Sequence, residues 1–262
     1  MWKTIVLFVV LILSVLSILS ILSPRRRMGV SEHYTDEVEI IHLVLYSPTF
    51  PYEDMRQATL PLYQLQAPRV ATWYYCYTEG ISDVRWDDQT RILHLPGKET
   101  YVPGILDKTV DAVRHALRRY PNARLVVRSN ASTVLDLPEM LHEVGDLGNL
   151  SVDYGGYMLN TLAWLDPAGG VVDETWWGTQ YASGTCILLS RARADALLQE
   201  ASFLRRNLVD DLCIGVWMRE HHPEVKMWSS SGKGWMNRHR QASRAKDVEA
   251  VKECVARLMT RK

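Results

Sequence analysis

The sequence lacks an excess of charge of either sign, a closely spaced cysteine pair, and a Gly/Ser-rich or Pro-rich linker. Its 262 residues carry 30 basic and 30 acidic side chains, which argues against a nucleic-acid-binding protein that depends on a basic surface. No CxxC motif suggests zinc or redox chemistry, and we predict that all four cysteines are buried: Cys76, Cys186, Cys213 and Cys254. An apolar content of 47% excludes a disordered chain and supports a hydrophobic core.

Charge is almost absent from the first 23 residues, where Lys3 is the only charged side chain. Residues 5–22 consist of Leu, Ile, Val and Phe with three serines, and as a helix they would measure roughly 27 Å, close to the ~30 Å hydrocarbon core of a bilayer. The run ends at Pro24 and three arginines rather than at a small-residue cleavage site. We therefore predict a single-pass membrane anchor within residues 1–27, rather than a signal peptide, followed by one domain over residues 28–262.

The side of the membrane is less clearly indicated. Lys3 and the amino terminus oppose the arginines at 25–27, and the positive-inside tendency slightly favours a cytosolic domain over a Golgi or ER lumenal one. The sequons at Asn130 and Asn149 would be glycosylated only in a secretory compartment. A glycan at Asn130 would block the site predicted below, which also favours the cytosol.

Strand-like and helix-like patterns alternate after the anchor. Strands are predicted at 38–46, 70–77, 92–95 and 124–128, with helices at 55–65 and 104–119. This order is typical of an α/β protein with an open, mostly parallel sheet flanked by helices, which binds ligands beyond the carboxyl ends of its strands. Further strands are predicted at 154–159 and 184–189, and further helices at 138–144, 191–200, 209–220 (capped by Asn207) and 247–259.

Two polar segments are candidates for chemistry. Asp210 and Asp211 begin a predicted helix. In one interpretation they only interact favourably with the helix dipole. In the other, one acts as a general base while the other holds the loop. The residues from Arg128 to Ser132 follow a strand and could meet a phosphate or a sugar, although such residues are also typical of a turn.

Two further segments have equally open interpretations. The stretch from Trp176 to Gly184 offers aromatic rings and small polar groups, which suit either carbohydrate stacking or ordinary loop packing. The basic segment from Arg238 to Lys246 suits either a phosphate clamp or a solvated surface.

Short motifs occur in a fixed order between residue 40 and the C-terminus. They are VLYS with Met55-Arg56, GKETYVPGILDKTVDAV, RLVVRSNASTVLDLPEML, WWGTQYASGTCILLSR, LVDDLCIGVWM, and the spaced residues Arg238, Arg244 and Asp247. Each motif is weak alone. Taken together, they resemble the GT-A glycosyltransferases related to the beta-1,3-galactosyltransferase and fringe group, and most of all those of large algal viruses and their relatives.

The resemblance implies a GT-A, Rossmann-like fold and an inverting transfer of a sugar from a nucleotide-sugar donor, of the UDP class, to a hydroxyl of a glycan or glycoprotein. It implies that Asp211 is the general base and that Asp210 positions the loop or the acceptor. The other residues that it assigns are Ser47 and Arg56 near the nucleotide, Arg128 and Arg238 near the diphosphate, and Trp177, Ser183 and Gly184 near the sugars.

One departure from the family concerns the metal. Where the family has the two aspartates of its DxD motif, this chain has Asn130 and Ser132, neutral ligands that bind a divalent ion such as Mn²⁺ more weakly than carboxylates do. We therefore hypothesise that Arg128 and Arg238 stabilise the leaving diphosphate. The lost carboxylates also favour an alternative, a catalytically inactive module that binds carbohydrate or organises partners. A glycoside hydrolase is disfavoured, because adjacent acids do not flank a sugar.

Overall fold

The computed structural model describes residues 37–66, 69–145, 152–230, 234–240 and 243–261. These residues belong to the second of two compact units, Thr35–Lys262. The predicted membrane anchor lies outside the described residues. Within the described ranges, no helix combines the length and the apolar character that crossing a membrane requires.

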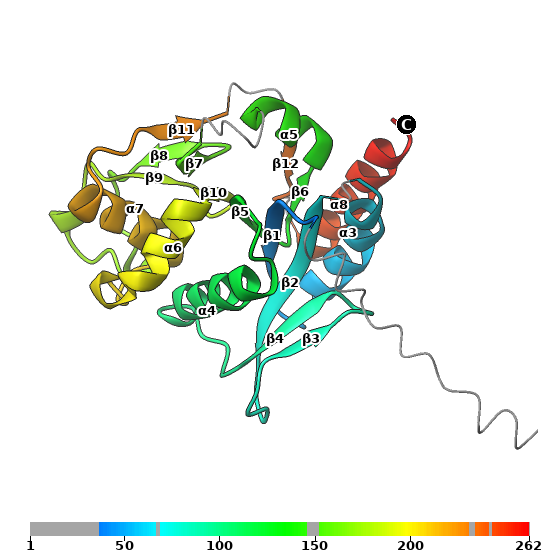
Figure 1. The fold of residues 1–262 in the computed structure, drawn as a ribbon, viewed down its shortest axis with the longest axis horizontal. Helices are drawn as coiled ribbons and strands as arrows, with labels where there is room; N and C mark the ends of the chain where they lie inside the picture. Colours follow the sequence, from blue (N-terminus) through cyan, green and yellow to red (C-terminus); the bar gives the residue numbers. More distant parts are fainter. Residues whose placement is uncertain (1–36, 67–68, 146–151, 231–233, 241–242, 262) are drawn as a thin grey trace, which may run out of the picture. The chain divides into compact units, whose positions relative to one another are not determined.

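A mixed, eight-stranded sheet forms the centre of this unit (Figure 1), in the order β11-β7-β10-β5-β1-β2-β4-β3. Its parallel part agrees with the prediction and contains β1 (Ile40–Leu45), β2 (Val70–Thr78), β4 (Ile92–Pro96) and β5 (Leu125–Asn130). Antiparallel pairing joins β10 (Cys186–Ser190) to both β5 and β7 (Tyr154–Gly156), and β3 (Arg85–Asp87) to β4. At the other edge, β11 (Met227–Ser229) runs parallel to β7.

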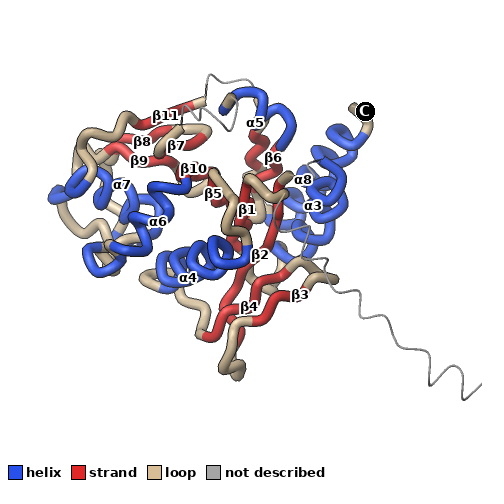
Figure 2. The backbone as a smooth tube through the Cα atoms, viewed as in Figure 1, coloured by secondary structure: helices blue, strands red, loops and turns tan. Residues whose placement is uncertain are grey.

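Helices cover both faces of the sheet (Figure 2), so the central strands are apolar on both sides. In β1, Ile41 and Leu43 belong to one hydrophobic core, whereas Ile40 and Val44 belong to the other. The first core includes α4 (Gly104–Arg119), α6 (Arg191–Gln199) and α7 (Asp210–His221). The second includes α3 (Tyr52–Gln66), α5 (Leu137–Val144) and α8 (Arg244–Met259).

Short elements account for most differences from the prediction. The strand expected at 154–159 is two strands, β7 and β8 (Leu159–Thr161), and β8 pairs with β9 (Gln180–Ala182). A separate two-stranded antiparallel sheet joins β6 (Thr133–Leu135) to β12 (Met236–Arg238). The connection between β8 and β9 contains the 3₁₀ helices η2 (Pro167–Gly169) and η3 (Glu174–Trp176), and η4 (Ala201–Phe203) follows α6. Three-residue elements are too short to produce a readable sequence period.

The start of α7 places the two aspartates. The predicted cap at Asn207 is wrong, because the cap residue is Val209, which makes no side-chain capping hydrogen bond. Val209 N donates instead to Gly169 O at 2.8 Å. Gly170 has φ +88°, and a Cβ there would lie 1.7 Å from Asn207 O, so only glycine allows this approach. As predicted, Asp210 and Asp211 lie in the first helical turn.

Candidate active site

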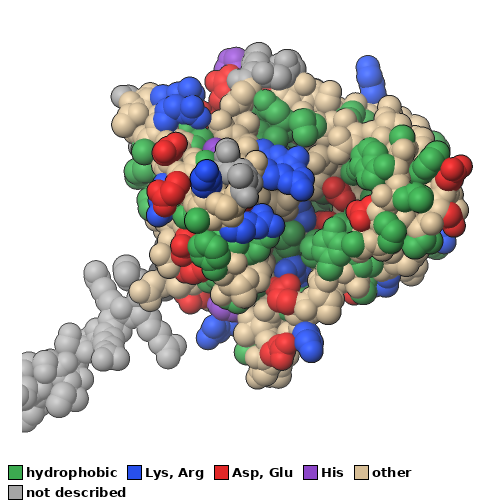
Figure 3. Space-filling view, turned by 180° about the vertical axis from the view of Figure 1, so that it is seen from behind, with side chains coloured by type: hydrophobic (Ala, Val, Ile, Leu, Met, Phe, Trp, Pro, Cys, Tyr) green, Lys and Arg blue, Asp and Glu red, His purple; other side chains and the backbone are tan. Residues whose placement is uncertain are grey.

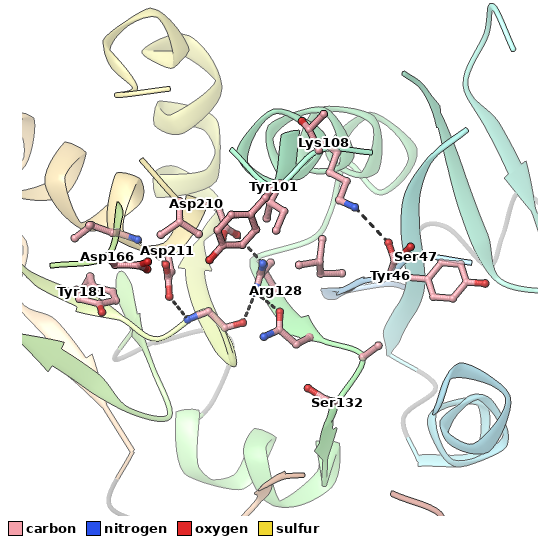
Figure 4. Close-up of a pocket in the computed structure, with 18 of the residues that line it drawn as sticks. Tyr46, Ser47, Tyr101, Lys108, Arg128, Ser132, Asp166, Tyr181, Asp210 and Asp211 are labelled. Atoms are coloured by element: carbon pink, nitrogen blue, oxygen red, sulfur yellow. Dashed lines mark hydrogen bonds and ion pairs between the residues drawn. The ribbon is translucent and has the colours of Figure 1, made fainter. Parts of the chain in front are cut away.

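A cavity of about 560 Å³ opens where β1 and β5 end. These two strands are parallel neighbours with Leu45 opposite Asn130, so their carboxyl ends deliver side chains to one edge of the sheet. Helix α7 and the turn before β10 close the other side (Figure 4). The cavity is lined by most of the residues that the sequence predicted: Ser47, Arg128, Asn130, Ser132, Gly184, Asp210 and Asp211. Seen from behind, the domain has a hollow with charged side chains of both signs (Figure 3).

The Arg128 guanidinium is the centre of a buried network. Its Nη2 lies 2.6 Å from Asp210 Oδ2, and both side chains are almost fully buried. Its Nη1 donates to Asn130 Oδ1 at 2.7 Å and to the carbonyl oxygen of Gly184. Because these partners engage both terminal nitrogens, Arg128 holds the site together, and the expectation that it contacts a diphosphate is not supported by this geometry.

The Asp211 carboxylate lies beside this network. Its Oδ2 accepts from Gly184 N at 2.8 Å, and its Oδ1 accepts from Leu212 N at 2.9 Å. Burial, followed by the neighbouring Asp210 charge, raises the pKa of Asp211 to about 6, against the opposing effects of the Gly184 N–H and Arg128. A carboxylate with this pKa is ionised at neutral pH and still basic enough to accept a proton from a hydroxyl.

Gly184 connects the two charged groups. Its N–H donates to Asp211 while its carbonyl accepts from Arg128, so one residue fixes both side chains. A Cβ at this position would lie 3.0 Å from Asp211 Oδ2 and 3.3 Å from Arg128 Nη1. A side chain at this position would therefore press on both charged groups.

A second ion pair lines the cavity near the end of β1, and our sequence analysis did not assign it to the site. Lys108 Nζ lies 2.5 Å from Glu99 Oε2 and donates to Tyr46 O at 3.3 Å. Burial lowers the pKa of Lys108, and the Glu99 carboxylate opposes that shift. Both residues occur in the motif GKETYVPGILDKTVDAV, but the pattern of a helix does not distinguish a buried lysine from a solvated one.

Other lining residues that the sequence analysis missed are Tyr101, Trp164 and Asp166, whereas Tyr181 belongs to the aromatic stretch that it singled out, Trp176 to Gly184. Aromatic content was thus the available signal. Composition does not tell which of several tryptophans faces a cavity.

Four predicted site residues do not line the cavity. Arg56 does not line the cavity; its Nη2 pairs with Glu53 Oε1 at 2.6 Å. Ser183 is buried and accepts from Thr185, while Trp177 is 40% exposed outside the cavity. Arg238 is exposed and lies opposite Thr133 in the β12–β6 pair. The next residue, His239, donates its backbone N–H to the O of Ser132, a lining residue, at 3.1 Å, so the backbone of Arg238 lies close to the cavity.

The residues at the position of the family's DxD motif do not fit a divalent metal ion. Asn130 Oδ1 already accepts from Arg128, and Ser132 offers only a neutral hydroxyl. Over the described ranges, no group of three or more His, Cys, Asp or Glu side chains converges as a ligand set.

Comparison with known proteins identifies the fold. No family model matches the chain, and no curated protein matches it in sequence. In structure it is similar to a glycosyltransferase involved in the glycosylation of the major capsid of PBCV-1, with a TM-score of 0.51 and 10% sequence identity. The similarity covers 82% of this chain and 99% of the other. The chain thus has the fold of a known viral glycosyltransferase, as the sequence resemblance implied.

Proposed function

We propose that this protein is a glycosyltransferase of the GT-A type, related to the beta-1,3-galactosyltransferase and fringe group. It moves a sugar from a nucleotide-sugar donor, of the UDP class, to a hydroxyl of a glycan or glycoprotein. The observation that carries the proposal is the Asp211 carboxylate, held by Gly184 in a cavity at the carboxyl ends of β1 and β5 and with a pKa of about 6. The likeness in fold supports the same reaction class.

The proposed reaction is a single inverting displacement. Asp211 removes the proton of the acceptor hydroxyl while the hydroxyl oxygen forms a bond to the anomeric carbon. The bond from that carbon to the diphosphate oxygen breaks on the opposite face, and the nucleoside diphosphate leaves with the electron pair. Arg128 and Asp210 act as positioning residues, because their ion pair and the Gly184 peptide hold the Asp211 carboxylate in place.

The donor nucleotide is proposed to bind at the end of β1, where Ser47, Tyr46 and Lys108 line the cavity. Lys108 and the bordering Arg238 would stabilise the charge that develops on the diphosphate. No step of this scheme uses a metal, since Asn130 and Ser132 do not fit one. We therefore expect full activity in the presence of EDTA. Loss of activity with EDTA and its recovery with Mn²⁺ would contradict this part of the proposal.

The anchor and the location of the domain belong to the same proposal. Residues 1–27 would hold the protein in a membrane as a single-pass anchor, with residues 28–262 as one catalytic domain on the cytosolic or the Golgi/ER lumenal side.

A carbohydrate-binding module without turnover is a second candidate, favoured by two observations. The position of the DxD motif carries the neutral side chains of Asn130 and Ser132, and the charge of Arg128 is engaged by Asp210. Such a module would bind a nucleotide sugar or a glycan and release no nucleoside diphosphate.

Donor hydrolysis by the full-length protein tests the proposal. A panel of UDP-, GDP- and CMP-sugars is incubated with the wild type, with Asp211→Asn, and with the control Asp83→Asn, an exposed aspartate outside the cavity. We expect the wild type and the control to release the nucleotide from one donor, as UDP, GDP or CMP, and Asp211→Asn to be about 10²- to 10⁴-fold slower. Turnover by Asp211→Asn at the wild-type rate would contradict the base assignment. Donor binding without release would favour the inactive module.

A further inference from the structure

At the Asp211 end of the cavity, negatively charged side chains outnumber positively charged ones. Glu99 pairs with Lys108 at 2.5 Å, and Asp210 pairs with Arg128 at 2.6 Å. The remaining charged groups among the described lining residues are two carboxylates, Asp166 and Asp211. This end of the cavity is therefore negative at neutral pH.

Asp166 is held in a fixed position near Asp211. Its Oδ1 accepts from Gly169 N at 3.1 Å, and its backbone exchanges two hydrogen bonds with Val171, at 2.8 and 3.0 Å. The side chain belongs to the segment between β8 and η2, and Figure 4 shows it on the same side of the cavity as Asp211 and Tyr181. The fixed backbone makes Asp166 a preorganised hydrogen-bond acceptor.

Aromatic rings line the same region. Tyr101 and Trp164 line the cavity yet remain 51% and 47% exposed. Burial, followed by the charges of Asp166, Asp211 and Asp210, raises the pKa of Tyr101, which indicates that its hydroxyl is close to these carboxylates. Large aromatic side chains that stay half-exposed in a cavity offer a flat apolar face to a ligand.

We propose that Tyr101, Trp164 and Asp166 form the acceptor subsite, and that the acceptor is an uncharged saccharide. The C–H face of the sugar packs on the rings, and its hydroxyls donate to Asp166, which leaves one hydroxyl beside Asp211. Hydroxyl groups gain charge-assisted hydrogen bonds from the two carboxylates, whereas a uronic, sialic or sulfated sugar meets like charges. The inference rests on the proposed function and adds the chemical class of the acceptor.

Matched pairs of sugars test this charge preference. Saturation-transfer NMR with the full-length protein and UDP compares p-nitrophenyl glucoside with p-nitrophenyl glucuronide, and methyl galactoside with methyl galacturonide. The members of each pair differ only at C6. We expect the neutral member of at least one pair to bind tenfold or more tightly than its uronide. Equal or tighter binding of the uronides would overturn the inference.

Two variants locate the binding. Trp164→Ala should weaken the neutral sugar about tenfold, and Asp166→Asn should reduce the ratio between the neutral sugar and the uronide. The control Phe203→Ala removes a 52% exposed ring outside the cavity and should change neither value. Unchanged affinities in both Trp164→Ala and Asp166→Asn would overturn the assignment of the subsite.

Donor hydrolysis without an acceptor separates this inference from the function on which it rests. The control Phe203→Ala should hydrolyse the donor at the wild-type rate, because its ring lies outside the cavity. If the wild type hydrolyses no donor but the sugar preference and its dependence on Trp164 hold, the transferase proposal fails and the saccharide site stands. If hydrolysis is normal and the preference is absent, only the inference about the acceptor fails.

Discussion

Two ion pairs with a buried cation line the cavity, and they differ in that cation. At the end of β1, Lys108 pairs with Glu99, whose side chain is 33% exposed. At the start of α7, Arg128 pairs with Asp210, and their side chains are only 3% and 4% exposed. A buried lysine can lose its proton when its partner is removed, whereas an arginine remains charged. The Arg128 pair should thus be the more rigid part of the cavity, and it is the pair connected to Asp211.

The largest expected effect comes from removing the carboxylate of the Arg128 pair. Asp210→Asn removes the paired carboxylate of a buried guanidinium and leaves only the more distant charge of Asp211, which should lower the free energy of unfolding by about 3 kcal/mol. Urea denaturation measures this loss. The control Asp195→Asn removes a half-exposed ion pair with Arg191 and should cost less than about 1 kcal/mol. Equal losses in the two variants would show that Arg128 is solvated.

A double variant separates stability from positioning. In Asp210→Asn/Arg128→Met the buried charge is gone, so much of the lost stability should return. Activity should not return, because Gly184 would no longer be held by Arg128. Recovery of both properties would contradict the positioning role of the pair.

The next effect is the pH dependence of Asp211. Its pKa is raised to about 6 in the folded protein, above its value of about 3.9 in an unfolded chain. Between these two values the folded state binds more protons, so the stability should fall as the pH rises from about 4 to 6, by at most about 1.4 kcal/mol per unit. The transfer rate should rise through about pH 6, since the base must be ionised.

Urea denaturation and kcat/KM measured from pH 4.5 to 8 check both trends. Asp211→Asn provides the control, because it removes the titrating group and should flatten this part of the stability curve. A wild-type rate that is constant from pH 5 to 7.5 would contradict the role of Asp211 as the base.

The main elements of the fold were predictable because strong local patterns determine them. The predicted bounds of α4 agree with the structure, since Pro103 precedes its first residue and Tyr120-Pro121 follows its last. Strands β1, β2 and β5 are buried on both faces, so each appears in the sequence as a continuous apolar run and not as an alternation of apolar and polar residues. The short strands β6 and β12 were missed because pairing across about a hundred residues leaves no local signal.

The site was predictable in part, for a related reason. Asn130 ends β5, Gly184 precedes β10 and Asp211 lies in the first turn of α7, so their position at the sheet edge could be inferred from topology. The sequence could not show that Arg128 forms a buried ion pair with Asp210, because the two residues lie in distant segments of the chain. Nor could it show that Trp164 rather than Trp177 lines the cavity, since both are exposed tryptophans in one loop.

A smaller effect is expected from adding one methyl group to the connection between Arg128 and Asp211. In Gly184→Ala, the new Cβ would press on both side chains, at 3.0 and 3.3 Å, so Asp211 must move by a few tenths of an ångström. We expect kcat to fall about tenfold with a smaller change in KM. Ser183→Ala, at the neighbouring position outside the cavity, should leave kcat within about twofold. A Gly184→Ala enzyme with the wild-type kcat would show that the base tolerates displacement.

The smallest effect should come from the Lys108 pair. Glu99→Gln removes the carboxylate, but an amide oxygen and the carbonyl of Tyr46 remain as acceptors, so the loss of stability should be only about 1 kcal/mol at pH 7. Without Glu99, burial lowers the pKa of Lys108 further, and the folded state then binds fewer protons than the unfolded state. The stability of the variant should consequently approach that of the wild type as the pH rises from 7 to 9. Asp210→Asn should show no such recovery, because Arg128 keeps its proton over this range. If the two variants lose the same stability and respond alike to pH, the difference between lysine and arginine does not determine how the two ion pairs contribute to stability.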